Sequence, residues 1–513
     1  MDHRQVNHKW GPWYDLSGSY AEPIASDENP ESFSGFAPTL HTDHVSGDRT
    51  RSVNYVFSTQ MLLPSSRVPG FIFHQTERTD HDGHFYCTRG VKECVNNSNT
   101  RDFDYLGYKY SLLSTLGTAG LNNVFTMIPA RDPAEFELLP KADINFIHDW
   151  LKWTDSNLPK LRNTEWIPTL PGPSVGNVDG THSMDGDEGF IFLFNPNPMQ
   201  LNVTLAVDES IGLLDAAQDQ HWQVSELFPT TGSVGTWASQ ESVVVSVEGG
   251  SARVLELRKH SVGPARLLHA TGARARVAMA DEKLELHEAL GVSGQEASVL
   301  VQASSPSAAA VNGVQCTLGA APMRAARWQI RAHFAGPSML GNAPVLPLPS
   351  KDFTGGWYNG TFKIPQAYFK QLKARATTYP IPWTHSASGC GQPHCVDDSK
   401  ATWLIPTRLL MAASVVHPAA DMQLRLLLDG KEVPLARSYN SRGRELHSCF
   451  LGFYFDASSL KAERDYHVAL NLPKLQAGQF YGLFWQNIET VYTDQVESCT
   501  ILPDGDHISE RIV

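Results

Sequence analysis

The stretch LLPSSRVPGFIFHQTER, residues 62–78, carries polar groups to the end of an apolar run. It is apolar at its start, turns at Pro69-Gly70 and ends in the polar run His74–Arg78. A loop that caps a helix would turn these groups toward water, whereas the end of a barrel strand would present them to a substrate. We interpret the stretch as a strand with a functional cluster at its end, and the capping loop is the alternative.

Length and composition limit the classes of protein that fit. The chain has 513 residues, too many for one hydrophobic core, so we expect about three or four domains. The formal charge of −13 argues against wrapping nucleic acid or an anionic membrane. No apolar run approaches the ~18–20 residues needed to span a bilayer. Aromatic residues make up 10% of the chain, and its 12 Trp suit both cores and sugar-binding surfaces.

Several features are typical of a secreted protein. The stretches CTRGVKEC and CGQPHC each place two cysteines close together, and one of the seven cysteines is left over if the others pair. Sequons of the form N-x-Ser/Thr begin at Asn96, Asn202 and Asn359. The first residues, MDHRQVNHKW, have neither the basic nor the apolar region of a signal peptide. We therefore expect a secreted protein and interpret this chain as the tail of a longer one.

The first part of the chain has the pattern of α/β structure. Apolar residues at helical spacing predict helices over DYLGYKYSLLSTLG and over the stretch that follows Asp132. Asp132-Pro133 and Lys141-Ala142-Asp143 are both typical of helix starts. Between the helices, Val124–Ile128 predicts a short buried strand. A strand followed by a polar loop and a helix is a βα unit.

Short strands separated by turns predict β modules in the rest of the chain. The run GFIFLFNPNPMQLNVTLAV predicts strand, Asn-Pro turn and strand, and the turn LDGKEV predicts a hairpin. A linker rich in Pro and Gly lies at about 336–350. We assign residues 1–165 to the α/β part, 166–262 to a β-sandwich, 263–345 to a small β domain with the linker, and 346–513 to a jelly-roll-like β-sandwich.

The segment STQMLLPSSRVPGFIFHQTER resembles the late-barrel segment of α-galactosidase-like (β/α)8 glycoside hydrolases. In that family a Tyr-Pro or Leu-Pro strand end, a Ser pair and a Gly precede a His-Gln-Thr-x-Arg motif, which His74–Arg78 matches in order and spacing. The stretch DFDYLGYKYSLLSTLGTAGLNN is similar to the next helix and last barrel strand, and GFIFLFNPN to the start of the following β-sandwich. The resemblance covers about residues 10 to 260.

The resemblance implies retaining hydrolysis of a glycosidic bond by a carboxylate pair, without a cofactor. The substrate would be an oligo- or polysaccharide. The acid/base residue of the family lies upstream of the motif, where Asp43 and Asp48 are the candidates, and its nucleophile lies earlier still, where Asp15 is the candidate. Asp15 fits a turn before Ser-Gly equally well.

In the same way the resemblance makes His74, Glu77 and Arg78 candidates for substrate binding. The sequence departs from the family elsewhere, because no Asp-Asp pair and no Lys-x-Asp strand occur. A (β/α)8 domain takes ~250 residues, and only about 165 precede the first sandwich. We therefore expect residues 1–165 to be the C-terminal part of a barrel, in a fragment or in a protein that has lost catalysis.

Other residue clusters support alternatives. The loops HTDH (41–44) and DHDGH (80–84) have residue types that suit zinc but lack a familiar spacing, and stoichiometric bound metal would favour a metal-dependent enzyme. CGQPHC (390–395) suits a local disulfide better than a metal site, and DGDEG (185–189) a hairpin turn better than a calcium loop.

Aromatic residues of the last module are candidates for stacking on sugar rings, and core packing is the alternative. They are Trp357, Tyr358, Trp383, Trp403 and Trp485. We include Trp403 among the substrate-binding candidates. A non-catalytic carbohydrate-binding or adhesion protein built from the same modules is therefore the main alternative to a hydrolase.

Overall fold

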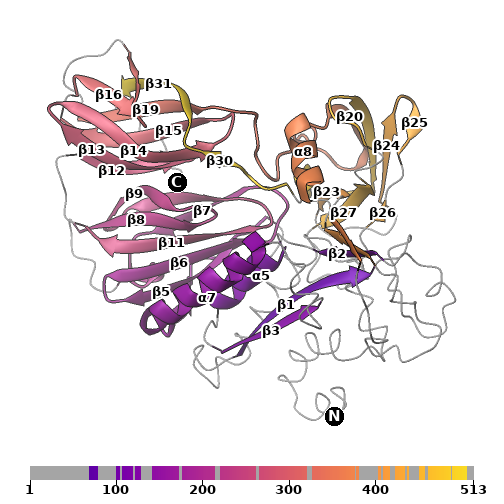
Figure 1. The fold of residues 1–513 in the computed structure, drawn as a ribbon, viewed down its shortest axis with the longest axis horizontal. Helices are drawn as coiled ribbons and strands as arrows, with labels where there is room; N and C mark the ends of the chain where they lie inside the picture. Colours follow the sequence, from indigo (N-terminus) through magenta and orange to yellow (C-terminus); the bar gives the residue numbers. More distant parts are fainter. Residues whose placement is uncertain are drawn as a thin grey trace.

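The computed structural model describes a chain that is mainly β-strand, with two helices near its N-terminal side and one in its last third (Figure 1). The described residues are 69–78, 100–103, 107–118, 122–128, 141–172, 176–213, 220–260, 265–304, 306–319, 326–375, 377–380, 402–405, 408–415, 422–433, 436–437, 450–456, 460–486 and 488–504.

The opening motif lies in a βαβ unit. Strand β1 (Pro69–Arg78) runs parallel to β3 (Asn122–Ile128), and helix α5 (Gly107–Leu116) lies between them in the chain. Their sheet has the order β21 (Thr377–Pro380), β22 (Thr402–Ile405), β2 (Thr100–Phe103), β1, β3. Within the described residues this sheet is open and mixed, because β2 is antiparallel to β1, and no barrel closes.

Helix α7 (Lys141–Leu161) begins at the lysine that the sequence indicates and packs against the next module. Its apolar side contributes Trp150 and Trp153, whose rings are 5.0 Å apart, and Trp153 lies 4.7 Å from the ring of Phe190. Helix α5 contacts both β1 and β11 (Ser251–Lys259), so it lies between the five-stranded sheet and the first sandwich. The two helices thereby attach the βαβ unit to the β modules.

Strand β6 (Glu188–Asn195) packs against both the helices and the core of the first sandwich. Phe190, Phe192 and Phe194 are fully buried in a cluster with α5 and α7. The alternate residues Ile191 and Leu193 are fully buried in the core of the sandwich. Successive side chains of a strand point to opposite faces, so the continuous apolar run of this strand is buried on both sides.

Two β-sandwiches are stacked through one continuous eleven-stranded sheet, on the left of Figure 1. In spatial order its strands are β18 (Thr317–Leu318), β31 (Val496–Pro503), β19 (Arg327–Phe334), β15 (Glu296–Ala303), β12 (Ala265–Thr271), β9 (Gly232–Ala238), β8 (His221–Phe228), β11, β6, β5 (Asp179–Asp185) and β4 (Thr164–Trp166). The sandwiches join where β12 pairs with β9 at His269 and Gly235. A Cβ at Gly235 would lie 2.6 Å from the Leu268 carbonyl oxygen, so the join requires glycine there.

Each sandwich is completed by a second, smaller sheet. The first uses β10 (Ser242–Val247) and β7 (Leu201–Ala206), and the short 3-10 helix η3 (Glu209–Ile211) follows β7. The second uses β13 (Ala273–Ala280), β14 (Lys283–Val292), β16 (Ala308–Val311), β17 (Val314–Gln315) and, paired with β14, β30 (Tyr492–Thr493).

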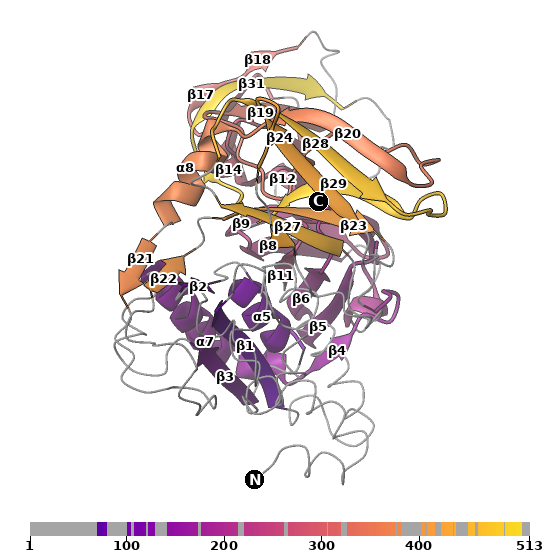
Figure 2. The ribbon, with the colours of Figure 1, turned by 90° about the vertical axis from the view of Figure 1, so that its right-hand side faces the viewer.

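A third module is inserted into the second sandwich. Its first sheet has the order β20 (Gly356–Lys363), β28 (Asp465–Leu472), β24 (Gln423–Leu428), β25 (Lys431–Glu432). Its other sheet has the order β26 (Ala436–Arg437), β27 (Phe450–Asp456), β23 (Arg408–Val415), β29 (Phe480–Gln486), and helix α8 (Gln366–Arg375) packs on its core. Figure 2 shows this module above the βαβ unit.

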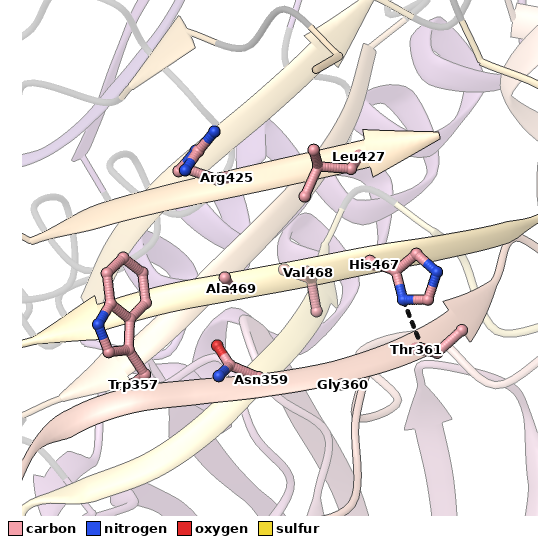
Figure 3. A pocket seen from close by; sticks show the side chains of 9 residues that line it. All are labelled: Trp357, Asn359, Gly360, Thr361, Arg425, Leu427, His467, Val468 and Ala469. Atoms are coloured by element: carbon pink, nitrogen blue, oxygen red, sulfur yellow. Dashed lines mark hydrogen bonds between the residues drawn. The ribbon is translucent and has the colours of Figure 1, made fainter. Parts of the chain in front are cut away.

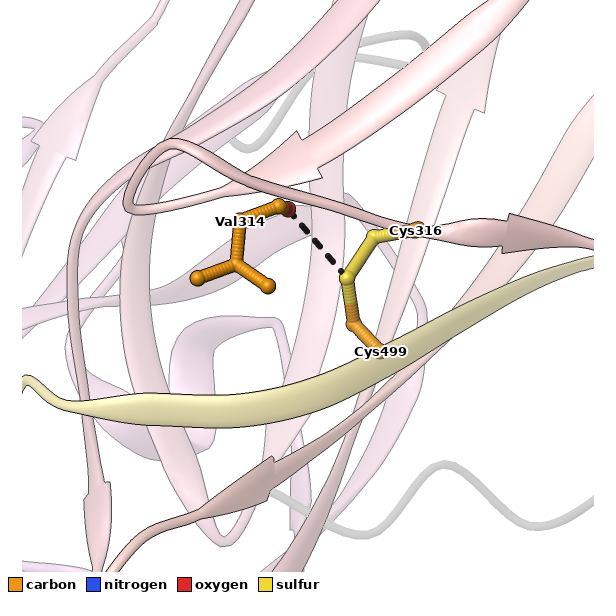
Figure 4. The surroundings of a disulfide bond; sticks show 3 residues. All are labelled: Val314, Cys316 and Cys499. Carbon is orange, nitrogen blue, oxygen red and sulfur yellow. Dashed lines mark hydrogen bonds between the residues drawn. A yellow bond between two sulfur atoms is a disulfide. The ribbon is translucent and has the colours of Figure 1, made fainter.

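The chain then returns to the second sandwich. Strand β31 pairs with β19 and β18, and Cys499 on it forms a disulfide with Cys316, 183 residues earlier (Figure 4). Ile501 of the same strand is buried in the core of that sandwich. This differs from the grouping of residues 346–513 in one module, since their last strand belongs with the strands of residues 265–334.

Local predictions that depend on turns are confirmed. The Asn-Pro turn separates β6 from β7, and the LDGKEV stretch forms the hairpin between β24 and β25. The DGDEG stretch is the hairpin turn between β5 and β6, where Asp185 pairs with Glu188. Residues 336–350 contain no helix or strand apart from an isolated bridge at Pro344.

Candidate functional site

The motif strand β1 and the strand that carries Trp403 belong to the same five-stranded sheet, with β2 between them. Arg78 on β1 is in register with Arg101 on β2, and Arg101 is in register with Trp403 on β22. Segments more than 300 residues apart in the sequence therefore contribute neighbouring strands at this level of the sheet. On the other side of β1, His74 is in register with Met127, next to the end of β3.

The proposed carboxylates lie outside the described residues. Asp15, Asp43 and Asp48 all precede residue 69, where the described part of the chain begins. The side chains of His74, Glu77, Arg78 and Trp403 also lie outside it, although their strands are described. Outside the described residues lie also the histidine loops at 41–44 and 80–84 and the cysteines at 390 and 395. The structure thus relates the binding candidates to one another through their strands.

A groove lies on the outer face of the third module (Figure 3). It has a volume of about 600 Å³ and crosses β20, β28 and β24. The register places Asn359 beside Ala469 and Thr361 beside His467, and Arg425 lies next to Ala469 on the far side. His467 Nδ1 is 3.0 Å from the Thr361 hydroxyl oxygen. The groove therefore combines an aromatic ring, Trp357 at one end, with amide, hydroxyl, imidazole and guanidinium groups.

The aromatic candidates of the last module differ in their exposure to solvent. Trp357 is 55% exposed, whereas Trp485 is 4% exposed and packs in the core, 5.3 Å from the ring of Phe362. Tyr358 points the other way from Trp357, and its hydroxyl donates to the Pro347 carbonyl. Burial raises the pKa of Tyr358 to about 12. Trp383 lies outside the described residues.

Sequence reasoning missed the polar partners of Trp357. Arg425 and His467 come from strands that follow β20 by 60 residues or more, and nothing local connects them. Only part of the groove could be predicted from the sequence. In the strand GWYNGTFK alternate residues share a face, which places Trp357, Asn359 and Thr361 together.

A second polar cluster is buried where the two stacked sandwiches meet. The Glu226 carboxylate, fully buried on β8, lies 2.5 Å from Arg253 Nε and 2.5 Å from Arg274 Nη2. The Arg274 guanidinium lies 4.9 Å from the centre of the Tyr492 ring. Tyr492 in turn donates to Glu248, whose other oxygen accepts from Thr490. The cluster holds two carboxylates and two guanidinium groups, so its formal charges cancel.

The pKa shifts in this cluster follow from burial and pairing. Burial raises the pKa of Glu248, against the effects of Arg274 and of the Thr490 and Tyr492 hydrogen bonds. Burial also raises the pKa of Tyr492 well above its usual value. For Arg274 burial acts to lower the pKa, but Glu226 and the other acidic neighbours outweigh it and raise the pKa. The charged groups of the cluster are paired inside the protein, and we interpret the cluster as a structural ion network.

No group of three or more His, Cys, Asp or Glu side chains in the described part is arranged to hold a metal ion. None of the described helices is long and apolar enough to cross a bilayer.

Comparison with known proteins finds no family. No protein-family model matches the chain, and no curated protein matches it significantly. Glycoside hydrolases are among the solved structures that are similar to parts of it. An α-amylase from Geobacillus thermoleovorans, complexed with acarbose, is 15% identical with a TM-score of 0.27, over 46% of this chain and 53% of the amylase.

Two further glycoside hydrolases are similar at the same low level. α-Galactosidase I from Mortierella vinacea is 8% identical with a TM-score of 0.21, over 43% of this chain and 64% of that one. A β-porphyranase of glycoside hydrolase family 86 from Bacteroides plebeius is 12% identical with a TM-score of 0.14, over 62% and 37%. The chain thus spans about half of the length of the amylase it matches. Scores this low do not establish a common fold, so function is argued from the residues of the chain.

Proposed function

We propose that this protein is a glycoside hydrolase of the α-galactosidase-like kind, which cleaves an oligo- or polysaccharide with retention of configuration. The observation that carries the proposal is the position of the His74–Arg78 motif at the carboxyl end of β1, parallel to β3. In α/β barrels the catalytic groups come from the carboxyl ends of parallel strands. The βα unit and the β-sandwich that follows it also agree with this kind of enzyme.

In this proposal His74, Glu77 and Arg78 bind the hydroxyl groups of the sugar. Arg donates up to five hydrogen bonds in a fixed geometry, and a carboxylate accepts them from hydroxyls, so the two types together can orient a sugar ring. Trp403 joins them as a stacking residue from β22, which lies beyond β2 in the same sheet.

The cleavage step needs two carboxyl groups. Asp43 or Asp48 would protonate the leaving oxygen, and Asp15 is the candidate nucleophile. A retaining mechanism requires the two carboxyl groups to be about 5–5.5 Å apart.

The test is hydrolysis of aryl α-galactosides and related glycosides by the full chain, with the anomer released first identified by NMR. We expect an α product, and a loss of about 10²–10⁴-fold in kcat/KM for D43N or D48N, whichever is the acid/base. The exposed Asp352, between the linker and β20, gives a matched control, and D352N should leave kcat/KM unchanged.

The alternative is a protein of the same modules that binds carbohydrate without cleaving it. It predicts oligosaccharide binding, measured by calorimetry, with no product formed at any enzyme concentration. Binding that is lost in R78A but kept in D43N and D48N, without turnover in the wild type, would favour this alternative. Neither binding nor turnover with any glycoside tested would sink both.

A further inference from the structure

Trp357 is an exposed aromatic residue on the flat face of a sheet. Four large apolar side chains in the described part of the chain are exposed, and Trp357 is the aromatic one among them. The large aromatic residues on the other face of the same sheet, Phe362 and Tyr466, are buried and stack on each other. An indole left in water in this way forgoes the favourable burial of a large apolar surface. This suggests that something covers it.

The residue two places further along the strand offers an attachment point for a sugar. Asn359 begins the sequon Asn359-Gly360-Thr361, and both Asn359 and Thr361 are exposed. Residues i and i+2 of a strand point to the same face and lie about 7 Å apart. The side chains of Trp357 and Asn359 therefore stand next to each other on the outer face, as Figure 3 shows.

The space beyond Asn359 is open. Its neighbour on β28 is Ala469, which has only a methyl group and lies between Asn359 and Arg425. The groove that results holds about 600 Å³, within the range of about 300–1,000 Å³ that is typical of small-molecule sites. Arg425 on the far side and His467 beside Thr361 line it with groups that bond to hydroxyls.

A separate observation agrees with the compartment in which sugars are attached. Cys316 and Cys499 form a disulfide that joins strands of the second sandwich. Disulfides form and persist in oxidising compartments such as the secretory pathway. N-linked glycans are attached to sequons of secreted proteins.

We propose that Asn359 carries an N-linked glycan, whose first sugar stacks on Trp357 and occupies the groove. In the attachment step the C1–O bond of a lipid-linked glycosyl diphosphate breaks, and a bond forms from C1 to Nδ2 of Asn359. The lipid diphosphate leaves with the electron pair of the broken bond, and the amide loses one proton to solvent. The apolar face of the sugar then covers the indole, and its hydroxyls face Arg425 and His467.

The chain contains a matched control. Asn202-Val203-Thr204 on β7 is also a sequon with an exposed Asn and an exposed Thr. The residue two places before it is Gln200, whose amide bonds to the Ser246 hydroxyl. A glycan at Asn202 therefore has no aromatic ring beside it on the strand.

The test is to direct the full chain into the secretory pathway of a eukaryotic host and to map glycopeptides by mass spectrometry. We expect a glycan on Asn359. NMR should then show upfield ring-current shifts for protons of the first sugar, and these shifts should disappear in W357A, which keeps the sequon. Removal of the glycan from the folded protein should lower the unfolding temperature by about 2–4 °C in the wild type but not in W357A.

In the control variant N202Q, both the ring-current shifts of the sugar and the difference in unfolding temperature should stay unchanged. A secreted protein with unmodified Asn359 would overturn the proposal, and so would a glycan whose sugar signals and unfolding temperature do not depend on Trp357. If Asn359 is unmodified and free oligosaccharides quench the Trp357 fluorescence, the groove binds carbohydrate from outside. None of these results depends on hydrolase activity.

Discussion

Arg274 of the second sandwich bonds to Glu226 of the first, with its Nη2 2.5 Å from the carboxylate. Glu226 is fully buried and also pairs with Arg253, so one carboxylate contacts two buried guanidinium groups. A Cβ at Gly232 would lie 2.6 Å from the Cβ of Arg274, which shows how closely the two modules approach. The pair therefore connects two modules at a point that water does not reach.

We predict that E226Q lowers the free energy of unfolding by about 3–5 kcal/mol, since it removes the carboxylate that both buried guanidinium groups contact. E288Q is the matched control, because Glu288 pairs with Arg276 on the surface, where both side chains are mostly exposed. An exposed pair contributes about 0–1 kcal/mol. Denaturant unfolding of the three proteins measures both values. Equal effects of the two variants would contradict a buried role for Glu226.

His269 lies at the join of the two sandwiches and gives the protein a pH dependence. Burial lowers the pKa of this histidine from its ordinary 6.5 to about 4. Its Nδ1 has no hydrogen-bond partner within the described residues. In the unfolded chain the imidazole takes up a proton below pH 6.5, whereas in the folded chain it stays neutral until about pH 4. Stability therefore falls as the pH drops through this window.

We predict that the part of this loss due to His269 is about 3 kcal/mol between pH 7 and pH 4. The variant H269Q cannot take up the proton, so its unfolding free energy should fall less over the same range. His182, whose pKa burial also lowers, stays in both proteins and cancels in the comparison. Parallel pH profiles for H269Q and the wild type would show that His269 is not the group responsible.

The parts of the fold that were predictable depend on local patterns. The apolar run of β6 and the helical spacing after Lys141 identified elements that the structure contains. The return of β31 was not predictable, because its partner β19 lies about 160 residues away and any apolar strand could fill that place. The same holds for β22 beside β2, and for Arg425 and His467 in the groove. Pairing of distant strands depends on the fit of whole modules, which a local pattern does not encode.

The disulfide between Cys316 and Cys499 links two parts of the second sandwich, one before and one after the inserted module in the chain. Its sequence separation of 183 residues is long, and a cross-link over a long loop reduces the entropy of the unfolded chain. We predict that the double variant C316S/C499S lowers the free energy of unfolding of the second sandwich by about 2–5 kcal/mol. For the wild type, the free energy of unfolding measured by denaturant should fall by the same amount when a reductant is added.

Peptide mapping without reduction supplies the control for this prediction. It should recover a cross-linked peptide pair that contains Cys316 and Cys499. The double variant should be insensitive to reductant in the β31 region, as followed by hydrogen exchange. Recovery of Cys316 or Cys499 bonded to another cysteine would contradict the pairing.

Gly117, just after α5, limits how closely the βαβ unit can approach the first sandwich. Its carbonyl accepts a hydrogen bond from the Thr181 hydroxyl, and Phe192 is fully buried next to it. A Cβ at residue 117 would lie 2.7 Å from two atoms of the Phe192 ring. Since the ring is enclosed, it cannot move away without disturbing the core that it shares with the helices.

We predict that G117A destabilises the protein by about 1–3 kcal/mol, the cost of overpacking a core. G172A is the matched control, because no atom lies within 4 Å of a Cβ built there, and its effect should stay within about 0.5 kcal/mol. The double variant G117A/F192L should recover part of the loss, since the smaller side chain makes room for the methyl group. If G117A unfolds at the same denaturant concentration as G172A, the helix does not pack against β6 as closely as the structure shows.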